Sequence, residues 1–378
     1  MLKSIYIKNI SSIGEMKLDL KKNSYKYKQD NVLNDVVNPV AIYGHNGSGK
    51  TSILRAIQYL EILLMRPIDQ LAPFTVNNVL FEEYQKDHNE KNVQGTIAIE
   101  FDIQGKQYKY SITTSLLNRK ITNEQLLLDN EEIISRNKNY YFYRGAKVEI
   151  GDSYLIPTLR KLANIEINDA ELQAVYSYLS SFTVLELPRI NSISGFVTSK
   201  MFETVSKFDL LVGKSLDVKK ILKDYKEFPV YDIVKKKTGL PNEVISPEFQ
   251  YEIEIEGNNN SKINLPYNMI SSGMQNQSML LSILLSMPSN SVLFIDELEQ
   301  ALHPSAIISF LDVIREKKVQ TIFTSHNTHI LQNLRPDQIY ITKWDNGFSS
   351  CDRLSDIYPN IREINNIEKM YLSGVFDQ

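Results

Sequence analysis

The pattern of apolar and polar residues changes at residue 40, where a short apolar run leads into a helical pattern. Residues 40–43 form the apolar run and predict a buried strand. From residue 51 to residue 65, apolar side chains recur at helical spacing, at Ile53, Leu54, Ile57, Leu60 and Leu64. A glycine-rich segment separates the two patterns. The sequence therefore predicts a contiguous strand, loop and helix.

Alternation of apolar and polar residues predicts antiparallel strands on both sides of this unit. A hairpin is expected around a turn at residues 12–14, from the apolar positions Ile5, Ile7, Met16, Leu18 and Leu20. A second hairpin or meander is expected between residues 95 and 112, because the same alternation is interrupted by a turn at 104–106.

The C-terminal third alternates between strand and helix patterns. Strands are expected at residues 292–295, 321–324 and 339–343, and helices at 274–286 and 304–316. This alternation indicates a parallel sheet with helices on its faces. In the middle of the chain, residues 158–181 and 210–237 are predicted to be mainly helical, and strand patterns return at 249–255 and from residue 263.

Together these elements predict an α/β fold in which the two ends of the chain form one split domain. We expect a mixed sheet with flanking helices, an antiparallel β subdomain and a helical insertion. The predicted bounds are an N-terminal lobe over residues 1–155, the insertion over 156–245 and a C-terminal lobe over 246–378.

Composition narrows the class of protein. The 378 residues are 42% hydrophobic and 23% charged, as expected for a soluble globular protein. The net charge of -3 does not favour general nucleic-acid binding, so such contact would depend on local lysine clusters such as residues 235–237. A single cysteine, Cys351, excludes an intrachain disulfide. With no membrane-length apolar run and no secretory signal, a cytoplasmic location without membrane contact is expected.

The glycine-rich segment carries a phosphate-binding motif. Residues 44–51, GHNGSGKT, match G-x-x-x-x-G-K-[ST] between a predicted strand and helix. In such a loop, backbone N–H groups and the helix N-terminus surround the phosphates. Lys50 would reach the β- and γ-phosphates, and Thr51 would bind Mg²⁺. The predicted nucleotide-binding residues here are Asn46, Gly47, Ser48, Gly49, Lys50, Thr51 and Ser52.

Two carboxylates follow the apolar run at 292–295. Asp296 and Glu297 are then expected at the C-terminal edge of a buried strand, where α/β proteins bind ligands. Asp296 would hold Mg²⁺, and Glu297 would polarise an attacking water. Strands also end in solvated acidic turns, but the phosphate-binding motif in the same chain favours the catalytic interpretation.

Two further segments are informative because of their distances in sequence from Asp296 and Glu297. Ser272, in the segment SSGMQ at 271–275, lies 24 residues before Asp296, and His326, in TSH at 324–326, lies 29 residues after Glu297. The set GHNGSGKT, SSGMQ, VLFIDE, ALHP and TSH resembles the ATP-binding-cassette head domain of the SMC and OLD-like branch of P-loop NTPases. The phrases DELEQALHP, FTSHNTHIL and EKMYLSG resemble small "AAA family" ATPases of bacterial abortive-infection and antiphage defence systems.

The resemblance implies a head-to-head homodimer or higher homo-oligomer with ATP between the phosphate loop of one subunit and the signature of the other. It implies that Ser272 and Gly273 contact the partner's γ-phosphate, with Gln275 in the same motif, and that His326 senses the γ-phosphate. Residues 301 and 302 would lie at the dimer seam. The signature departs from LSGGQ at Ser271 and Met274, which weakens the expectation of rapid turnover.

A glutamine that connects the nucleotide to the helical lobe is less evident, and Gln125 is the candidate. Two histidines, His326 and His329, have a metal-like spacing, but no other ligand lies nearby in sequence, so zinc is not expected.

The first functional hypothesis is a Mg²⁺-dependent ATPase with Lys50, Glu297 and His326 as its catalytic residues. It would act as a dimeric switch or scaffold that controls a separately encoded effector, such as a nuclease, in antiphage defence, with DNA, RNA or a phage protein as further contacts. The second is an SMC-like DNA-repair ATPase that acts directly on DNA. The third is an ATP-dependent assembly protein with negligible turnover.

Overall fold

The strand that precedes the phosphate-binding motif lies inside a large mixed sheet. This strand, β5 (Val40–Gly44), runs parallel to β17 (Gln320–Thr324) on one side and to β18 (Ile339–Asp345) on the other. Beyond β17 lies β16 (Val292–Asp296), also parallel. Every residue of β5, β16 and β17 is buried, which explains their nearly continuous apolar sequences. The predicted strand and the predicted parallel sheet are both confirmed.

The computed structural model describes residues 1–65, 78–88, 93–115, 117–137, 140–149, 155–164, 169–186, 230–238, 248–256, 261–266, 269, 271, 280–281, 283–284, 287–300, 302 and 304–377. The chain divides into two compact units. Unit 1 comprises Met1–Val184, Asn290–Asp296 and Gln320–Gln378, and unit 2 comprises Leu185–Ser289 and Glu297–Val319. Unit 1 therefore contains both ends of the chain and also residues 156–184, which the sequence pattern had assigned to the insertion.

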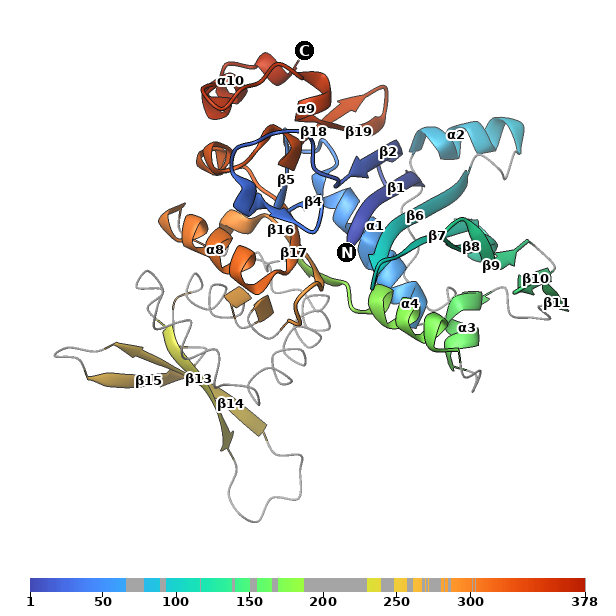
Figure 1. Ribbon diagram of the computed structural model, residues 1–378, viewed down its shortest axis with the longest axis horizontal. Coiled ribbons are helices and arrows are strands. Elements are labelled where there is room, and N and C mark those ends of the chain that lie inside the picture. Colours follow the sequence, from blue (N-terminus) through green and yellow to red (C-terminus); the bar gives the residue numbers. More distant parts are fainter. Residues whose placement is uncertain are drawn as a thin grey trace. The chain divides into compact units, whose positions relative to one another are not determined.

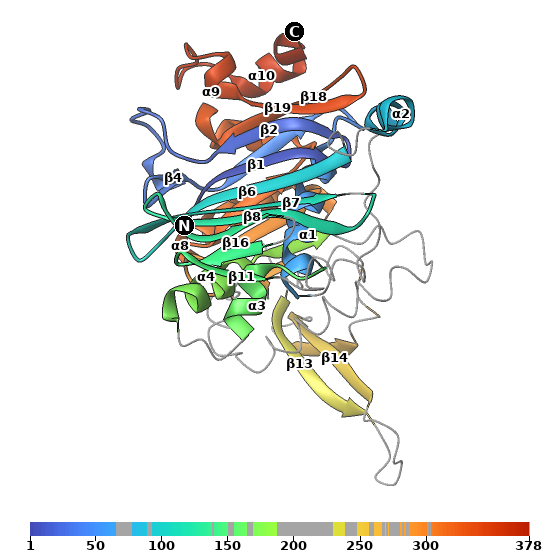
Figure 2. The same ribbon diagram turned by 90° about the vertical axis from the view of Figure 1, so that its right-hand side faces the viewer.

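Mostly antiparallel strands extend the sheet of unit 1 beyond β18, the pair β19–β2 being parallel. In the described part of the chain the sheet order is β11-β10-β9-β8-β7-β6-β1-β2-β19-β18-β5-β17-β16-β12. Figure 2 shows β19, β2, β1, β6, β7 and β8 following one another across it. The remaining bounds are β1 (Leu2–Ile10), β2 (Ile13–Asp19), β6 (Gln94–Ile103), β7 (Lys106–Ser115), β8 (Lys120–Leu128), β9 (Glu131–Arg136), β10 (Tyr140–Tyr143), β11 (Ala146–Glu149), β12 (Thr183–Glu186) and β19 (Phe348–Arg353). Both predicted hairpins, β1–β2 and β6–β7, are confirmed.

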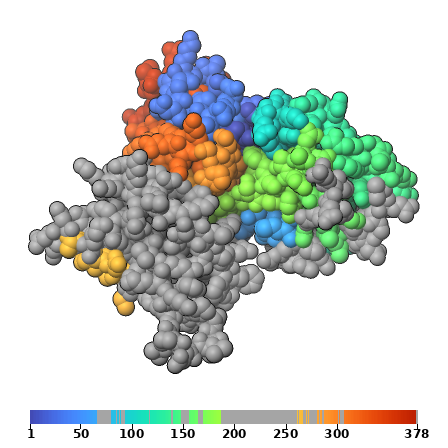
Figure 3. All heavy atoms as spheres, turned by 60° about the horizontal axis from the view of Figure 1, so that its bottom comes forward, coloured from blue at the N-terminus to red at the C-terminus, as the bar shows by residue number. Residues whose placement is uncertain are grey.

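Helices of unit 1 pack on this sheet. The helix after the glycine-rich loop, α1 (Lys50–Met65), contacts β1, β5 and β16, and most of its residues are buried. Two further helices, α3 (Thr158–Asn164) and α4 (Ala170–Ser180), contact each other, and α4 also contacts α1. In Figure 3 their green atoms lie beside the teal atoms of the antiparallel strands. Another helix, α2 (Asn78–Asp87), follows α1 along the chain. In the described residues no helix is long and apolar enough to cross a membrane.

A buried carboxylate connects α3 to the antiparallel strands. Glu124 of β8 accepts hydrogen bonds from the backbone N–H groups of Thr158 and Leu159, at 2.5 and 2.9 Å, and from the hydroxyl of Tyr110 at 2.9 Å. It thereby satisfies N–H groups that the first turn of a helix leaves without partners. Arg136 lies 3.8 Å from the same carboxylate and donates to the carbonyl of Ile156.

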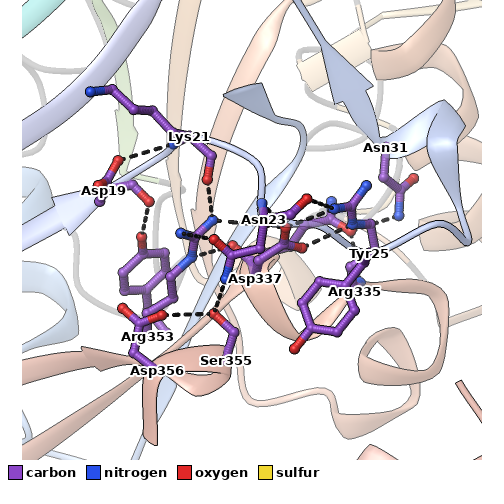
Figure 4. Close-up of polar contacts among 12 residues, drawn as sticks. Asp19, Lys21, Asn23, Tyr25, Asn31, Arg335, Asp337, Arg353, Ser355 and Asp356 are labelled. Carbon is purple, nitrogen blue, oxygen red and sulfur yellow. Dashed lines mark hydrogen bonds and ion pairs between the residues drawn. The ribbon is translucent and has the colours of Figure 1, made fainter. Parts of the chain in front are cut away.

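A buried ion network ties the connection between β2 and β5 to the C-terminal part of the chain (Figure 4). Arg335 makes two hydrogen bonds to Asp337, at 2.9 and 2.7 Å, and both side chains are fully buried. Asn23 donates its backbone N–H to Asp337 at 2.8 Å and accepts a bond from Arg353 at 3.3 Å. Asn31 donates to Gln338 at 2.7 Å. The network therefore fixes a loop that contains only η1 (Gln29–Asn31), β3 (Val32–Leu33) and β4 (Val36–Val37).

Short helices complete the C-terminal part of unit 1. They are η8 (Thr328–Asn333), η9 (Pro336–Gln338), α9 (Leu354–Ile357), α10 (Ile367–Leu372) and η10 (Val375–Asp377). Figure 1 shows α9 and α10 near the C-terminus.

The described part of unit 2 corrects one prediction. It contains η7 (Leu298–Gln300), α8 (Pro304–Lys317) and an antiparallel sheet of β13 (Val230–Thr238), β14 (Glu248–Glu256) and β15 (Lys262–Pro266). The helix predicted over 210–237 is wrong for residues 230–237, because β-branched and aromatic residues at 230–234 favour a strand and pair with β14. The lysines at 235–237 therefore lie on a strand. The rest of that prediction lies outside the described residues.

Candidate functional site

The phosphate-binding loop is built from backbone conformations that only glycine adopts easily. Gly47 and Gly49 have φ angles of 81° and 101°. A Cβ atom on Gly49 would lie 2.5 Å from the Cβ atom of Ser349 on β19, whereas one on Gly47 would meet no atom within 4 Å. The two glycines are thus required for different reasons. Gly49 permits close packing on β19. Gly47 is required only for its φ angle, because a Cβ atom there would meet no neighbour.

The lysine of the motif lies inside the loop. Lys50 begins α1 and is only 6% exposed. Its Nζ donates to the carbonyl oxygens of Gly44 and His45, at 2.8 and 2.9 Å. The ammonium group therefore lies against the loop backbone at the N-terminus of a helix. This end of a helix favours anions such as phosphate, and the ammonium group adds a positive charge there.

Asp296 lies beside the same loop, as the sequence predicted for the end of its strand. Its Oδ2 accepts a hydrogen bond from Thr51 at 3.0 Å, and its Oδ1 accepts one from Thr324 at 2.6 Å. The ends of β16, β17 and β5 are adjacent because the three strands are parallel neighbours. A carboxylate next to a threonine hydroxyl provides the hard oxygen ligands that Mg²⁺ prefers. The residues present therefore fit a magnesium ion held by Thr51 and Asp296.

Sequence reasoning missed Thr324, which orients the carboxylate of Asp296. The threonine is buried and is the last residue of β17. A signal for it was present in the sequence, because polar residues that end neighbouring parallel strands meet at one edge of the sheet.

Sequence reasoning also missed a set of hydroxyl contacts that hold the loop in place. Ser48 lies 2.5 Å from the hydroxyl of Thr342 on β18. Ser52 accepts a hydrogen bond from Ser12 at 2.8 Å, and Ser12 in turn accepts one from Ser349 at 2.8 Å. Ser48 and Ser52, predicted to bind nucleotide, are thus both mostly buried, Ser48 against Thr342 on β18 and Ser52 against Ser12 in the turn between β1 and β2. Asn46 is exposed in the loop.

Glu297 has a strained backbone. Its φ angle is 52°, in the left-handed region that residues other than glycine rarely adopt. The carboxylate accepts a hydrogen bond from the side-chain amide of Gln300 within unit 2. Strain of this kind is concentrated at functional sites, so it is consistent with a special role for the residue that follows Asp296.

His326 is exposed, while the residues on either side of it are fixed to β5. Ser325 donates its N–H to the carbonyl of Ile42 at 3.2 Å. The hydroxyl of Tyr43 donates to the carbonyl of Asn327 at 2.8 Å. The histidine therefore follows the strand between β5 and β16, at the same sheet edge as the phosphate-binding loop.

Other predicted site residues lie elsewhere or outside the described residues. Ser272, Gly273, Gln275 and Ala301 lie outside them, and Leu302 is buried. Gln125 lies within β8, where its amide donates to Glu132 of β9 at 2.9 Å, and not in a helix or loop. Residues 121–126 belong to β8 and pair with β7, so the interpretation of Gln125 as a helix or loop residue is wrong.

Solved structures that resemble the chain include the SMC head domain from Thermotoga maritima, with 14% identity over 93% of this chain and 98% of that chain and a TM-score of 0.44. A second is an Smc head bound to the C-winged helix domain of ScpA, with 14% identity, 94% and 99% coverage and a TM-score of 0.49.

A third is the Smc head with an extended coiled coil bound to the C-terminal domain of ScpA from Pyrococcus furiosus, with 12% identity, 100% and 99% coverage and a TM-score of 0.49. No curated protein matches the chain. The family model described as "AAA domain, putative AbiEii toxin, Type IV TA system" matches residues 40–332, which include both the phosphate-binding loop and Asp296. The chain therefore belongs to this family of nucleotide-binding AAA-domain ATPases.

Proposed function

We propose that the protein is a Mg²⁺-dependent ATPase that works as a nucleotide-gated dimeric switch. The observation that carries this proposal is the contact between Thr51 of the phosphate-binding loop and Asp296 at the end of β16, at 3.0 Å. The two residues are 245 positions apart in sequence, and their meeting joins a phosphate-binding loop to an acidic strand end.

Each residue of the site has a role in this proposal. The ammonium group of Lys50 leaves the carbonyls of Gly44 and His45 to bind the β- and γ-phosphate oxygens of ATP. Thr51 and Asp296 hold Mg²⁺, which when bound neutralises charge that develops on the phosphates. Glu297 orients the attacking water and accepts its proton. His326 contacts the γ-phosphate.

The switch itself depends on a second subunit. In the proposal, Ser272, Gly273 and Gln275 of one subunit contact the ATP bound to its partner, so ATP closes a homodimer and hydrolysis opens it. Dimer closure controls a separately encoded effector, such as a nuclease, in antiphage defence within the cytoplasm. The family's description as part of a toxin–antitoxin system supports a role beside a separately encoded partner.

The test compares wild type with Lys50→Ala and Glu297→Gln, by phosphate release and by mass in solution with and without Mg²⁺ and ATP. Because Lys50 binds the phosphates, Lys50→Ala should lose ATP binding and remain monomeric. Because Glu297 accepts the proton, Glu297→Gln should bind ATP, hydrolyse it about 100-fold more slowly and accumulate dimer.

The matched control is Glu316→Gln, the same change at an exposed position of α8 in unit 2, which should behave as wild type. Unimpaired hydrolysis by Glu297→Gln would overturn the catalytic assignment. If wild type forms an ATP-dependent dimer without phosphate release, the protein is a non-hydrolysing assembly protein. If duplex DNA stimulates hydrolysis in a salt-sensitive way, the protein acts directly on DNA.

A further inference from the structure

The last α-helix of the chain, α10, packs against η8, the segment that begins two residues after His326. Glu368 is the second residue of α10 and is only 9% exposed. Carboxylates are rarely buried to this extent unless they are paired. We therefore expect Glu368 to be paired with residues of the segment that α10 contacts.

Glu368 contacts three side chains of η8. Thr328 donates its hydroxyl to Oε1 at 3.1 Å, and the side-chain amide of Gln332 donates to Oε2. The Nδ1 atom of His329 lies 2.9 Å from Oε1, and protonation of this imidazole makes the contact an ion pair. One carboxylate thus holds the first, second and fifth residues of η8 together.

Contacts within residues 325–329 and one with β5 hold the start of the same segment. The side chain of Asn327 caps η8 by accepting from the N–H of His329 at 3.0 Å, and the backbone N–H of Asn327 donates to Ser325 Oγ at 3.0 Å. The hydroxyl of Tyr43 binds the carbonyl of Asn327. His326 is therefore flanked by fixed residues, and the position of η8 sets the direction in which its chain leaves β17.

A second residue of α10 reaches the strand that leads into the phosphate-binding loop. The ring of Tyr371 packs edge-on against the ring of Tyr43, with 5.7 Å between centroids. Tyr43 immediately precedes Gly44. One helix thus contacts both the segment after His326, through Glu368, and the strand before the phosphate-binding loop, through Tyr371.

We propose that Glu368 is a positioning residue that holds residues 325–329 in the conformation in which His326 meets the γ-phosphate. This inference rests on the proposed function. Without the carboxylate, Thr328 and Gln332 lose their common acceptor, and η8 moves relative to β17. His326 then spends less time in its productive orientation. Because Lys50 and Thr51 are not altered, ATP still binds, so the change affects kcat and not KM.

The experiment measures kcat and KM for ATP hydrolysis in wild type, Glu368→Ala, Glu368→Gln and the control Glu363→Ala, which removes an exposed acid five residues earlier. Glu368→Ala should lower kcat by about 10- to 100-fold, the loss that follows misplacement of a reacting group. KM should stay within about twofold of wild type. Glu368→Gln keeps one acceptor oxygen, which can serve Thr328 or Gln332 but not both, and should recover part of kcat. Glu363→Ala should match wild type.

A double-mutant cycle with His326→Ala separates positioning from general stability. If Glu368 acts through His326, adding Glu368→Ala to His326→Ala should lower kcat by no more than about twofold. An equal loss in both backgrounds, or wild-type kcat for Glu368→Ala, would overturn the inference while leaving the ATPase intact. Absence of ATP hydrolysis by wild-type protein would instead overturn the proposed function.

Discussion

At the scale of single residues, the two inner glycines of the phosphate-binding loop illustrate two different constraints. Gly47 and Gly49 share a positive φ angle, so each would strain an L-residue. Only Gly49 also faces a neighbouring strand at close range, because a Cβ there would lie 2.5 Å from the Cβ of Ser349. In the sequence motif the two glycines look equivalent. In the structure only Gly49 is constrained by packing as well as by its φ angle.

Replacement of each glycine by alanine should therefore have unequal costs. Gly47→Ala should lower the free energy of unfolding by about 1–2 kcal/mol, the cost of a left-handed L-residue. Gly49→Ala should lower the free energy of unfolding by about 1–3 kcal/mol more than Gly47→Ala, because its Cβ overpacks against Ser349. The Cβ of Ser349 is fixed by the backbone of β19. Urea unfolding of the two variants measures the difference. Equal losses would show that contact with β19 does not constrain Gly49.

Among the residues of the site, those within one contiguous motif were predictable and those brought from other elements were not. Lys50, Thr51 and Asp296 follow from a loop motif and from an apolar run that ends in acids. Thr324 and Thr342 contact the site because β17 and β18 lie beside β5 in the sheet. Ser349 on β19 reaches the loop through Ser12. Thr342 and Ser349 carry no distinctive signal of such contacts in one sequence, whereas the position of Thr324 at the end of a parallel strand does.

At the scale of elements, buried charges fix the long connection between β2 and β5. Arg335 and Asp337 are fully buried, and Arg353 is 6% exposed. A buried pair is strongly destabilising when only one partner is removed, because the other charge remains desolvated. The backbone and side chain of Asn23 bind this network, so the connection is held by polar contacts in addition to its few apolar residues.

Asp337→Asn tests the importance of this charge. The variant leaves two mostly buried arginines without their carboxylate and should lower the free energy of unfolding by about 3–5 kcal/mol. Asp356→Asn makes the same chemical change at an exposed residue that accepts a bond from Ser355, at 3.0 Å, and should cost about 0.5 kcal/mol or less. Urea denaturation measures both. Similar values for the two variants would rule out a special contribution from the buried charge.

The elements themselves were predicted unevenly. The strand and helix on either side of the phosphate-binding loop, and the alternation at the C-terminal end, were confirmed because contiguous apolar runs and helical spacing identify them. Residues 230–237 were assigned to a helix, and instead β13 forms there because pairing with β14 supplies its backbone hydrogen bonds. The consecutive lysines at 235–237 show neither helical nor strand periodicity, so they did not distinguish a helix from a strand.

At the scale of the whole molecule, Cys351 offers a probe of unit 1 that is far from the loop in sequence. It is the only cysteine in the chain, lies on β19 and is 5% exposed. Burial raises the pKa of its thiol well above the ordinary value. Because the thiolate is the reactive form, the native thiol should react with a disulfide reagent only when β19 opens.

Nucleotide binding should slow this labelling if β19 opens through unfolding of the whole unit. At an ATP concentration of about 100 times Kd, linkage stabilises the folded state by about 2.7 kcal/mol, so the labelling rate should fall by about 100-fold. The rate is measured at pH 8 with and without Mg²⁺ and ATP. Lys50→Ala should show no such protection. An unchanged rate in wild type that demonstrably binds ATP would mean that β19 opens locally.

The sequence by itself determined the phosphate-binding loop, its flanking strand and helix, and the acidic end of β16, because each depends on a contiguous pattern. Tertiary structure alone decided that Thr324 orients Asp296, that Gly49 packs on β19 and that Glu368 holds the segment after His326. These contacts join residues from different strands and helices. Their partners are selected by the order of strands in the sheet and by the docking of α10, which no local periodicity encodes.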